Sequence, residues 1–352
     1  MVIDGSYGEG GGQVLRTSLA LAVLTDQPVR IEGIRAGRRQ AGLRPQHLTA
    51  VRAAAAVSDG WLEGDNLGSQ YVTLVPGRGA RCGDFALDVA EAAQGGSAGS
   101  VGLILQTVLL PLARSKGDST LTVRGGTHVP WSPSASYVEH VFLPTVARMG
   151  VHTEVEVDQW GFYPAGGGRI RAHIRGVVGP LRPIVSAERG EVVRVWGIAA
   201  VTNLPSHIAQ RMANRARNVL AGASLAGRVE PRRLRSAGPG AGLFLFVEYE
   251  SSLAGFTAYG RKGLPAEQVA DRACKSLIEH HRGGAPVDPH LADQLVLPMA
   301  LAKGESRLVT SRVTQHLLTN VWAVQQFLAC SAKVEGQLGE RGLLVVQGGG
   351  HD

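Results

Sequence analysis

Apolar residues are concentrated along the chain in longer and in shorter runs, and the two patterns predict different elements. The runs Val14–Leu24 and Val101–Leu110 are apolar over about ten residues, a length typical of buried helices. The runs Val192–Ala199 and Leu243–Glu250 are rich in β-branched and aromatic residues, which predicts strands. Helix-like stretches alternate with these two strands at His207–Ala221 and Pro265–His280.

One helix-and-strand pattern occurs more than once. Residues 110–121 read LPLARSKGDSTL, and residues 297–308, which begin 187 positions later, read LPMALAKGESRL. A fainter copy lies 89 positions before the first, where the run Val14–Leu24 precedes an extended stretch that ends at Arg35. Each copy therefore predicts a polar or glycine-rich loop, a buried helix, a turn and a strand.

The composition changes between the second and third copies. Residues 183–280 hold a cluster of arginines and a strand–helix–strand–helix series that would form a small αβ unit. Because the repeats resume afterwards, we expect this segment to be inserted into a larger domain. The predicted domains are a large repeat-built one at 1–182 and 281–352, and a small αβ one at 183–280.

The composition indicates a folded cytoplasmic protein. Hydrophobic residues make up 44% of the 352 positions and charged residues 18%, which excludes a disordered chain. No apolar run is long enough to span a membrane, so no membrane association is expected. The three cysteines are far apart and odd in number, which argues against a disulfide framework or a zinc site.

A net charge of +7 comes from 36 basic and 29 acidic residues, and most of the cations are arginines. Guanidinium groups bind phosphate in a forked geometry, so RNA or DNA is the expected partner. The alternative is a GC-rich genome that favours arginine everywhere. Because aromatic residues make up only 5% of the chain, a broad base-stacking surface is not expected.

The opening segment Gly8–Arg16 (GEGGGQVLR) has the composition of a phosphate site. Glycines let backbone N–H groups approach a phosphate, and the start of a following helix adds partial positive charge. Arg16 would supply a full charge, and Glu9 would hold a divalent metal on the other side of the phosphate. The alternative is a flexible glycine turn before a buried helix.

Two polar residues interrupt apolar helices at matching repeat positions, namely Gln106 and Asp293. Buried polar groups need partners, so either the two side chains hydrogen bond between helices or they line a shared central ligand site. The chain pattern leaves both possibilities open.

Four segments together resemble the RNA 3′-terminal phosphate cyclase family. They are GEGGGQVLR at 8–16, IRAGR at 34–38 with QHLT at 46–49, GFYPAGGG at 161–168, and HLADQ at 290–294 with HLLTN at 316–320. The resemblance covers nearly the whole chain. It implies an α/β fold with α+β layers, in which a large domain of three repeated βαβ-type units carries a smaller inserted αβ domain.

The resemblance also implies a reaction. His316, which directly precedes LLTN, occupies the position of the family's nucleophile. It would attack ATP to give a covalent histidine–AMP intermediate, and the AMP would pass to an RNA 3′-phosphate to form a 3′-pp-5′ adenylate. The neighbouring 2′-hydroxyl would then close a 2′,3′-cyclic phosphate and release AMP.

Further site residues follow from the same resemblance. Glu9 matches a metal-binding carboxylate, and the metal would be magnesium or manganese. The ATP and RNA-end positions match Arg16, Arg35, Gln46, Gln106, Pro133, His290, Leu291, Ala292, Asp293 and Gln294. His47 is expected either to contact the substrate phosphate or to cap a helix. The partner is RNA with a 3′-phosphate end, and the oligomeric state is not readable.

The chain departs from the family pattern at three positions. Trp160 stands before the glycine-rich turn where Arg or His is usual, Thr257 stands where an aromatic neighbour of adenine is expected, and His290 replaces a tyrosine of some relatives. These changes predict ATP use with relaxed nucleotide selectivity. Two alternatives are a non-catalytic cyclase-like protein of ribosomal RNA processing, which would lack His316, and an enolpyruvyl-transferase-like enzyme, which needs no nucleophilic histidine.

Overall fold

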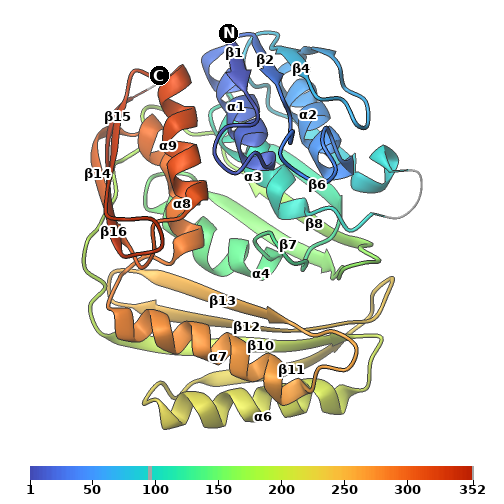
Figure 1. The fold of residues 1–352 in the computed structure, drawn as a ribbon, viewed down its shortest axis with the longest axis vertical. Helices are drawn as coiled ribbons and strands as arrows, with labels where there is room; N and C mark the ends of the chain where they lie inside the picture. The colour runs from blue at the N-terminus through green and yellow to red at the C-terminus, as the bar shows by residue number, and fades with distance from the viewer. Residues whose placement is uncertain (94–96, 351–352) are drawn as a thin grey trace.

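The computed structural model describes residues 1–93 and 97–350. Figure 1 shows a larger body of helices and sheets above a smaller one, in which helices cover one face of a sheet. The larger body contains three four-stranded sheets and the smaller body contains one. None of the described helices has both the length and the apolar character needed to cross a membrane. The mixed α/β architecture expected from the sequence is therefore confirmed.

The first sheet has the order β1-β2-β4-β3, with β1 and β2 parallel and the other pairs antiparallel. Its helix α1 connects the parallel strands, so the unit begins as βαβ and ends as a helix followed by a hairpin. The elements are β1 (Val2–Asp4), α1 (Gly12–Thr25), β2 (Val29–Glu32), α2 (Pro45–Ser58), β3 (Trp61–Glu63) and β4 (Val72–Val75).

The second sheet repeats this topology in the order β5-β6-β8-β7. Its second helix is interrupted by a π-helical turn, so α4 and α5 form one continuous helical segment. The elements are β5 (Asp84–Asp88), a 3-10 turn (Val89–Ala92), α3 (Val101–Ala113), β6 (Ser119–Gly125), α4 (Ala135–Tyr137), the π turn (Val138–Phe142), α5 (Leu143–Ala147), β7 (Thr153–Gln159) and β8 (Gly168–Ile174).

The third sheet has the corresponding order β9-β14-β16-β15, and its first strand pairs in parallel with the second. Strand β9 therefore takes the place that β1 and β5 hold in the other units, although more than a hundred residues separate it from β14 along the chain. The elements are β9 (Val185–Ser186), α8 (Pro289–Leu301), β14 (Lys303–Thr310), α9 (Gln315–Phe327), β15 (Ser331–Glu335) and β16 (Gly342–Gly349).

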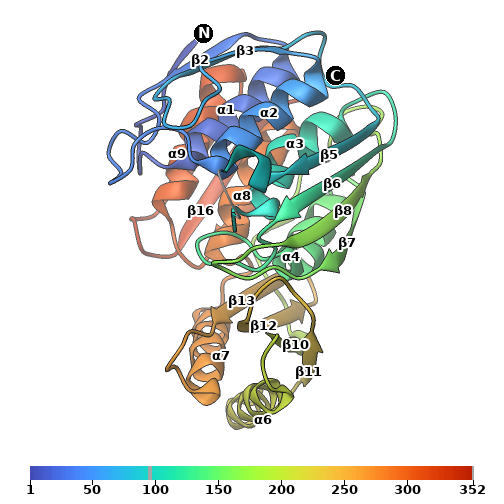
Figure 2. The same cartoon turned by 90° about the vertical axis from the view of Figure 1, so that its right-hand side faces the viewer.

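The smaller body lies between β9 and α8 in the chain. Its sheet has the order β11-β10-β12-β13, and both of its helices cover the face turned away from the larger body (Figure 2). The elements are β10 (Val192–Thr202), α6 (Ser206–Gly222), β11 (Arg228–Leu234), β12 (Gly240–Tyr249), β13 (Leu253–Tyr259) and α7 (Ala266–Gly283). Residues 185–186 pair with β14, while the exact domain division at 183 and 280 stays a prediction.

The expected helices begin at polar caps that the sequence supplies. Ser100 accepts a hydrogen bond from the backbone N–H of Leu103 at the start of α3, and Thr314 accepts one from Leu317 at the start of α9. Such caps satisfy N–H groups that have no partner within the helix. Pro111 and Pro298, which the repeated sequence pattern shares, lie inside α3 and α8 at matching places. The repeat seen in the sequence is thus a repeat of structure.

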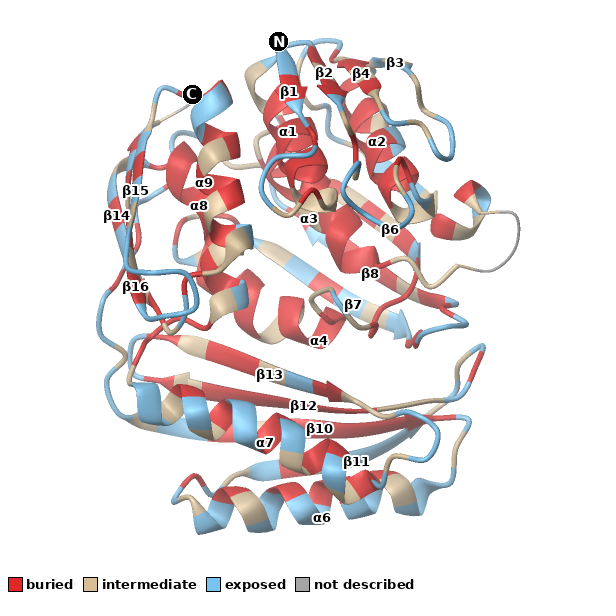
Figure 3. Cartoon of the chain, in the orientation of Figure 1, coloured by how far each residue is buried: buried red, intermediate tan, exposed pale blue. Residues whose placement is uncertain are grey.

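An aromatic cluster joins the smaller body to the second unit. Trp160 stacks on the buried ring of His128 with centroids 3.7 Å apart, and Phe244 of β12 meets the His128 ring edge-on at 4.8 Å. Tyr259 of β13 packs edge-on against Phe162 at 6.3 Å. Figure 3 shows that β10 and β12, the central strands of the smaller body's sheet, are largely buried. The departure at Trp160 therefore has a structural role, since the indole fills an inter-domain core.

Candidate functional site

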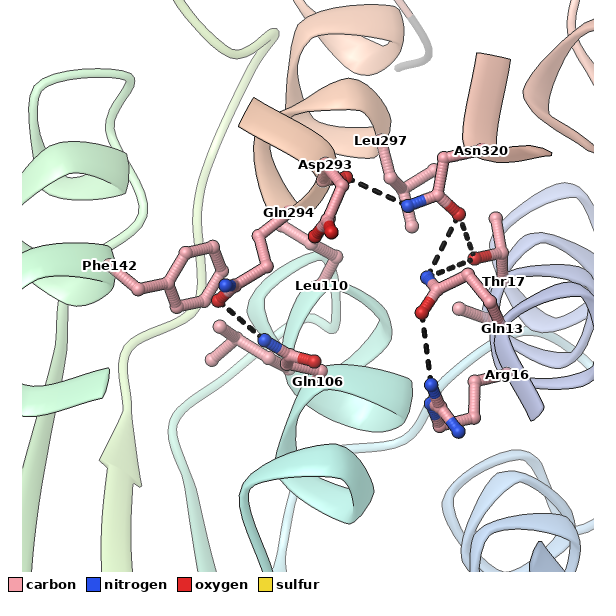
Figure 4. A pocket seen from close by; sticks show the side chains of 12 residues that line it. Gln13, Arg16, Thr17, Gln106, Leu110, Phe142, Asp293, Gln294, Leu297 and Asn320 are labelled. Carbon is pink, nitrogen blue, oxygen red and sulfur yellow. Dashed lines mark hydrogen bonds between the residues drawn. The ribbon is translucent and has the colours of Figure 1, made fainter. Parts of the chain in front are cut away.

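The candidate site lies where helices of all three units meet. A cavity is lined by side chains from α1, α3, α8 and α9, with Phe142 of the π turn beside them (Figure 4). Its polar lining consists of Gln13, Arg16, Thr17, Gln106, Asp293, Gln294 and Asn320. Four of the residues expected from the sequence are in this lining, and the repeat has brought them together from distant parts of the chain.

The glycine-rich loop lies against α9. The ring of Tyr7 stacks on Trp322, with centroids 4.0 Å apart and planes 13° from parallel. Gly8 has a left-handed backbone (φ 67°) and packs so closely on Thr319 that a side chain at position 8 would overlap its hydroxyl. The loop therefore needs glycine for conformation and for close approach, and it carries Glu9 to the start of α9.

His316 and Glu9 form the centre of this arrangement. The His316 Nε2 atom lies 3.2 Å from Glu9 Oε2, and Arg38 Nη2 lies 3.4 Å from the same oxygen. Burial lowers the pKa of His316 from its usual value, the nearby Arg16, His290 and Arg38 add to that effect, and Glu9 opposes it. A neutral imidazole with a free nitrogen lone pair is thus favoured at neutral pH, as nucleophilic attack requires.

Arg16 is a buried cation held by a polar network. Its Nη2 donates to Gln13 Oε1 at 2.9 Å, and Gln13 Nε2 donates to Asn320 Oδ1 at 2.9 Å. Thr17 also donates to Asn320 Oδ1, at 2.7 Å. Burial lowers the pKa of Arg16 to about 10, which leaves the guanidinium charged at neutral pH. A buried fixed cation beside a cavity favours an anion.

The two polar residues at matching repeat positions both line the cavity. Gln106 Nε2 donates to Gln294 Oε1 at 2.6 Å, so the amide partner of Gln106 is the neighbour of Asp293 in the chain. The Asp293 side chain points into the cavity (Figure 4). Burial and the nearby Asp288 raise the pKa of Asp293 well above its usual range, against the effect of Arg16. Hydrogen bonding between helices and a shared cavity are therefore both present.

The segment 290–294 is the first part of α8, and its residues point in different directions. His290 is exposed, whereas the side chains of Leu291 and Ala292 are buried in the core outside the cavity lining. The helix is capped by Asp288, whose Oδ1 accepts from the N–H groups of His290 and Leu291. Only Asp293 and Gln294 of this segment present side chains to the cavity.

Three other expected residues lie around the cavity rather than in its lining. Arg35 has a left-handed backbone (φ 56°) and donates from Nη1 to the carbonyl oxygen of Gln40 at 2.6 Å. Gln46 Oε1 accepts a hydrogen bond from the backbone N–H of Ser100 at 3.2 Å, at the start of α3. Pro133 precedes α4, and its carbonyl oxygen lies beside Gly102 in the first turn of α3.

His47 is buried and serves as a cap. Its Nδ1 accepts from the backbone N–H of Arg44 at 3.2 Å, so the ring proton of the neutral form is on Nε2. Burial and three nearby guanidinium groups lower the pKa of His47 to about 3, which keeps the ring neutral. Its Nε2 faces Gly12, where a Cβ atom would come within 2.5 Å of that nitrogen. The helix-cap alternative for His47 is present, and the N–H is directed toward the glycine loop.

Four functional candidates carried no distinct signal in the sequence analysis. Gln13, Thr17 and Asn320 form the network that holds Arg16, and Arg38 pairs with Glu9. Gln13 lies in the motif GEGGGQVLR and Asn320 in the motif HLLTN, so the sequence motifs include both residues without indicating that they pair. Their pairing across more than three hundred residues depends on how α1 and α9 pack, which the motifs alone do not specify.

The described residues offer few protein ligands for a metal ion. Among them, no group of three or more His, Cys, Asp or Glu side chains is arranged to hold a metal ion. Magnesium commonly keeps several waters and binds through one or two carboxylates together with substrate phosphates. Glu9 alone fits that manner of binding, since its carboxylate lies in the glycine loop beside Arg38 and His316.

Fold and site together define a mixed α/β protein of three repeated units. A histidine, a carboxylate and a buried arginine lie near the N-termini of its helices α1 and α9. A family model described as RNA 3'-terminal phosphate cyclase matches residues 7–334. The chain belongs to this family, which is a family of enzymes.

Several curated relatives are similar over nearly their whole length. The RNA 3'-terminal phosphate cyclase of Trichormus variabilis is 53% identical over 325 residues, which are 92% of this chain and 93% of the relative. The protein of that name from Methylococcus capsulatus is 52% identical, covering 98% of this chain and 95% of its own. The one from Pyrobaculum neutrophilum is 41% identical and covers 99% of both chains.

One solved structure, the enolpyruvyl transferase NikO from Streptomyces tendae, aligns with a TM-score of 0.41 and 12% identity, over 99% of this chain and 48% of that chain. This similarity is too low to bear on the fold or the activity of the present chain.

Proposed function

We propose that this protein converts an RNA 3′-phosphate end to a 2′,3′-cyclic phosphate at the expense of ATP, with His316 as the covalent nucleophile. The observation that carries the proposal is the position of His316 at the start of α9, 3.2 Å from Glu9 and facing a site that holds the buried cation Arg16. Membership of the cyclase family and the names of the relatives support the substrate.

The first step forms a bond between a ring nitrogen of His316 and the α-phosphorus of ATP, and the bond to pyrophosphate breaks. In the second step an oxygen of the RNA 3′-phosphate attacks the same phosphorus, which breaks the P–N bond and restores His316. In the third step the neighbouring 2′-hydroxyl attacks the 3′-phosphorus and releases AMP and a proton. AMP is a better leaving group than an oxide, so activation makes ring closure feasible.

Each proposed site residue has a part in these steps. Arg16 and the N-termini of α1 and α9 stabilise charge that develops on phosphate oxygens. Glu9 orients His316, and it would hold a magnesium or manganese ion whose charge screens the triphosphate. Gln106, Asp293 and Gln294 offer polar groups to the nucleotide within the cavity.

The other expected residues border the reacting groups. Arg35 and Gln46 stand on the side of the glycine loop and α2, where the RNA end would enter. Pro133 and the first turn of α8, from His290 to Ala292, would border the nucleotide. The protein is further proposed to act in the cytoplasm on RNA ends.

The decisive experiment is labelling with ATP that carries radioactive phosphorus at the α position, in the presence of magnesium or manganese, followed by a denaturing gel. Wild type and a His207→Ala control, which alters an exposed histidine of α6, are expected to retain the label. The His316→Ala variant is expected to retain none. Acid-labile and base-stable label would identify the bond as a phosphoramidate.

The outcomes separate the alternatives. Label on His316→Ala as well would place the nucleophile elsewhere. Absence of label on folded wild type with either metal would contradict the proposed mechanism and favour a non-catalytic cyclase-like protein or an enolpyruvyl-transferase-like enzyme. Cyclic phosphate formed from a 3′-phosphorylated oligoribonucleotide would then complete the test of the substrate.

Nucleotide selectivity is a separate part of the proposal. Thr257 is exposed on β13, and Phe256 packs on the other face near His280 with ring centroids 5.3 Å apart. With no aromatic side chain at Thr257 and with His290 at the start of α8, we expect relaxed discrimination among nucleoside triphosphates. Covalent labelling with α-labelled GTP or CTP in place of ATP tests this selectivity. Label from ATP alone would contradict the expected relaxed discrimination.

A further inference from the structure

Trp131 is the most exposed aromatic side chain among the described residues. Its exposed fraction is 91%, in a protein whose other tryptophans are largely packed apart from Trp61. The Trp131 backbone is left-handed (φ 62°), a conformation that is unfavourable for a bulky residue. Because the Trp131 indole is exposed to water, it contributes no burial energy that would offset its unfavourable backbone conformation. This indicates that the side chain binds a ligand.

A second exposed aromatic ring stands beside it. Tyr163 is 61% exposed, and its ring lies edge-on to Trp131 with centroids 6.4 Å apart. Because the indole is 91% exposed despite this contact, most of its ring surface is accessible. Nucleobases stack on aromatic faces of this kind, with little dependence on sequence.

A series of hydrogen bonds and a β-bridge connects this aromatic pair to the candidate site. Gln46 accepts the N–H of Ser100, and Ser100 forms a parallel bridge with Gly126, which opens the loop that carries Trp131. The N–H groups at the start of that loop donate to the carbonyl oxygen of Gly161, which opens the turn that carries Tyr163. The pair thus stands at the end of a short path that begins beside the proposed RNA-end residue Gln46.

Two exposed cations flank the same path. Arg124 ends the segment of β6 before Gly126, and Arg235 immediately precedes Ser236, whose hydroxyl donates to the carbonyl oxygen of Trp160 at 2.6 Å. Within residues 1–93 and 97–350, neither guanidinium forms an ion pair with a carboxylate of the chain. Guanidinium groups without a carboxylate partner, in segments connected to the exposed aromatic pair, match the alternating phosphates and bases of a single strand.

We propose that Trp131, together with Tyr163, stacks one nucleobase of the RNA substrate upstream of the 3′-phosphate end. This proposal rests on the proposed function, because it assumes that the 3′ end is held near Gln46 and His316. The low aromatic content of the chain fits a single stacking position rather than an extended surface. Arg124 and Arg235 contact the phosphates on either side of that base.

The test compares Trp131→Ala and Trp131→Phe with Trp61→Ala, a matched control in β3 that removes an indole 59% exposed at the edge of another sheet. The measurements are the Kd for a 3′-phosphorylated single-stranded 10-mer by fluorescence anisotropy, and covalent labelling with α-labelled ATP in the absence of RNA. Trp131→Ala is expected to weaken RNA binding by roughly 5- to 100-fold. Trp131→Phe should retain most of the affinity, and Trp61→Ala should not change it.

A series of the same 10-mers, each with one abasic nucleotide, locates the base. Wild type is expected to lose affinity at one position, and Trp131→Ala is expected to show no further loss at that position. Equal RNA affinity of wild type and Trp131→Ala would overturn the proposal. A raised KM for ATP in the labelling reaction, with unchanged RNA affinity, would overturn it too, because Trp131 would then contact the nucleotide. Absence of label on wild type would instead contradict the proposed function.

Discussion

At the scale of single residues, the charges around His316 determine whether its imidazole is a nucleophile. Burial and the nearby Arg16, His290 and Arg38 lower its pKa, and the Glu9 carboxylate raises it. Since the folded pKa lies below the usual value of 6.5, the ring stays neutral at pH 7 and becomes protonated only as the pH falls through the lowered value. Labelling of His316 should therefore be retained at mildly acidic pH.

Two variants shift this pKa in opposite directions. Glu9→Gln removes the carboxylate and is expected to lower the His316 pKa further, whereas Arg38→Gln removes a cation and is expected to raise it. The measurement is an NMR titration of the His316 ring, assigned by its loss in His316→Ala. A wild-type midpoint above 6.5, or a rise in Glu9→Gln, would contradict the electrostatic account.

Gly12 provides a steric test of the same site. A Cβ atom at Gly12 would lie 2.5 Å from His47 Nε2 and 2.6 Å from Arg16 Nη1, so alanine must displace both of these buried groups. We expect Gly12→Ala to slow labelling of His316 by roughly 10²-fold, because small displacements of positioning groups are costly to reaction rates. Gly37→Ala is the matched control, since a Cβ there meets nothing within 4 Å. Equal rates for the two variants would rule out the steric role.

At the scale of elements, the cap of α8 connects three parts of the fold. The carboxylate of Asp288 caps α8 and accepts from Tyr137 of α4, whose hydroxyl lies 2.9 Å from both oxygens. A longer contact of 3.4 Å reaches it from the N–H of Gly255 in β13. The helix that carries Asp293 into the cavity is thus fixed by one buried side chain.

Removing that side chain should therefore destabilise the fold. Loss of a cap costs about 1 kcal/mol, and an unsatisfied buried hydroxyl costs about 1–3 kcal/mol more. We expect Asp288→Ala to lower the free energy of unfolding by about 2–4 kcal/mol, and Tyr137→Phe, which keeps the cap, to lower it less. Urea denaturation of both variants measures this, and an equal or smaller effect of Asp288→Ala would contradict it.

The elements also show how far the sequence determines the structure. The predicted helix Val14–Leu24 is confirmed as α1, and the predicted strand Leu243–Glu250 as β12, because long periodic apolar runs are strong local signals. Strand β9, by contrast, has two residues and no local pattern, and it forms only because β14 offers a free edge. The partner of Gln106 depends likewise on the relative rotation of α3 and α8, which is a property of packing.

At the scale of the whole molecule, net charge is an incomplete guide to the binding surface. In the smaller body, Arg211 pairs with Glu267 and Arg215 with Asp271, each at 2.7 Å. Arginines that looked like a polyanion site in the sequence are therefore partly neutralised by carboxylates of the neighbouring helix α7. Such pairing joins residues 56 positions apart, and it is invisible until α6 and α7 are placed side by side.

The docking of the smaller body gives the last prediction. Trp160 is buried against His128, whose ring nitrogens hydrogen bond to Thr127 and Ser136 and whose pKa burial lowers to about 3. Trp160→Ala should cost about 3–5 kcal/mol, as other large-to-small core changes do, and should lower the Tm measured by calorimetry. Trp160→Phe, which keeps an aromatic ring, should lower it less.

The consequence for activity follows from where the site is built. The cavity lining, Glu9 and His316 all come from the three repeated units, so the docked body contributes no side chain to the lining. At 20 °C, well below unfolding, Trp160→Ala should therefore label His316 at nearly the wild-type rate. A proportional loss of labelling at that temperature would show that the position of the smaller body controls the nucleotide site, and Asp288, which contacts Gly255 of that body, would then be the connection to examine.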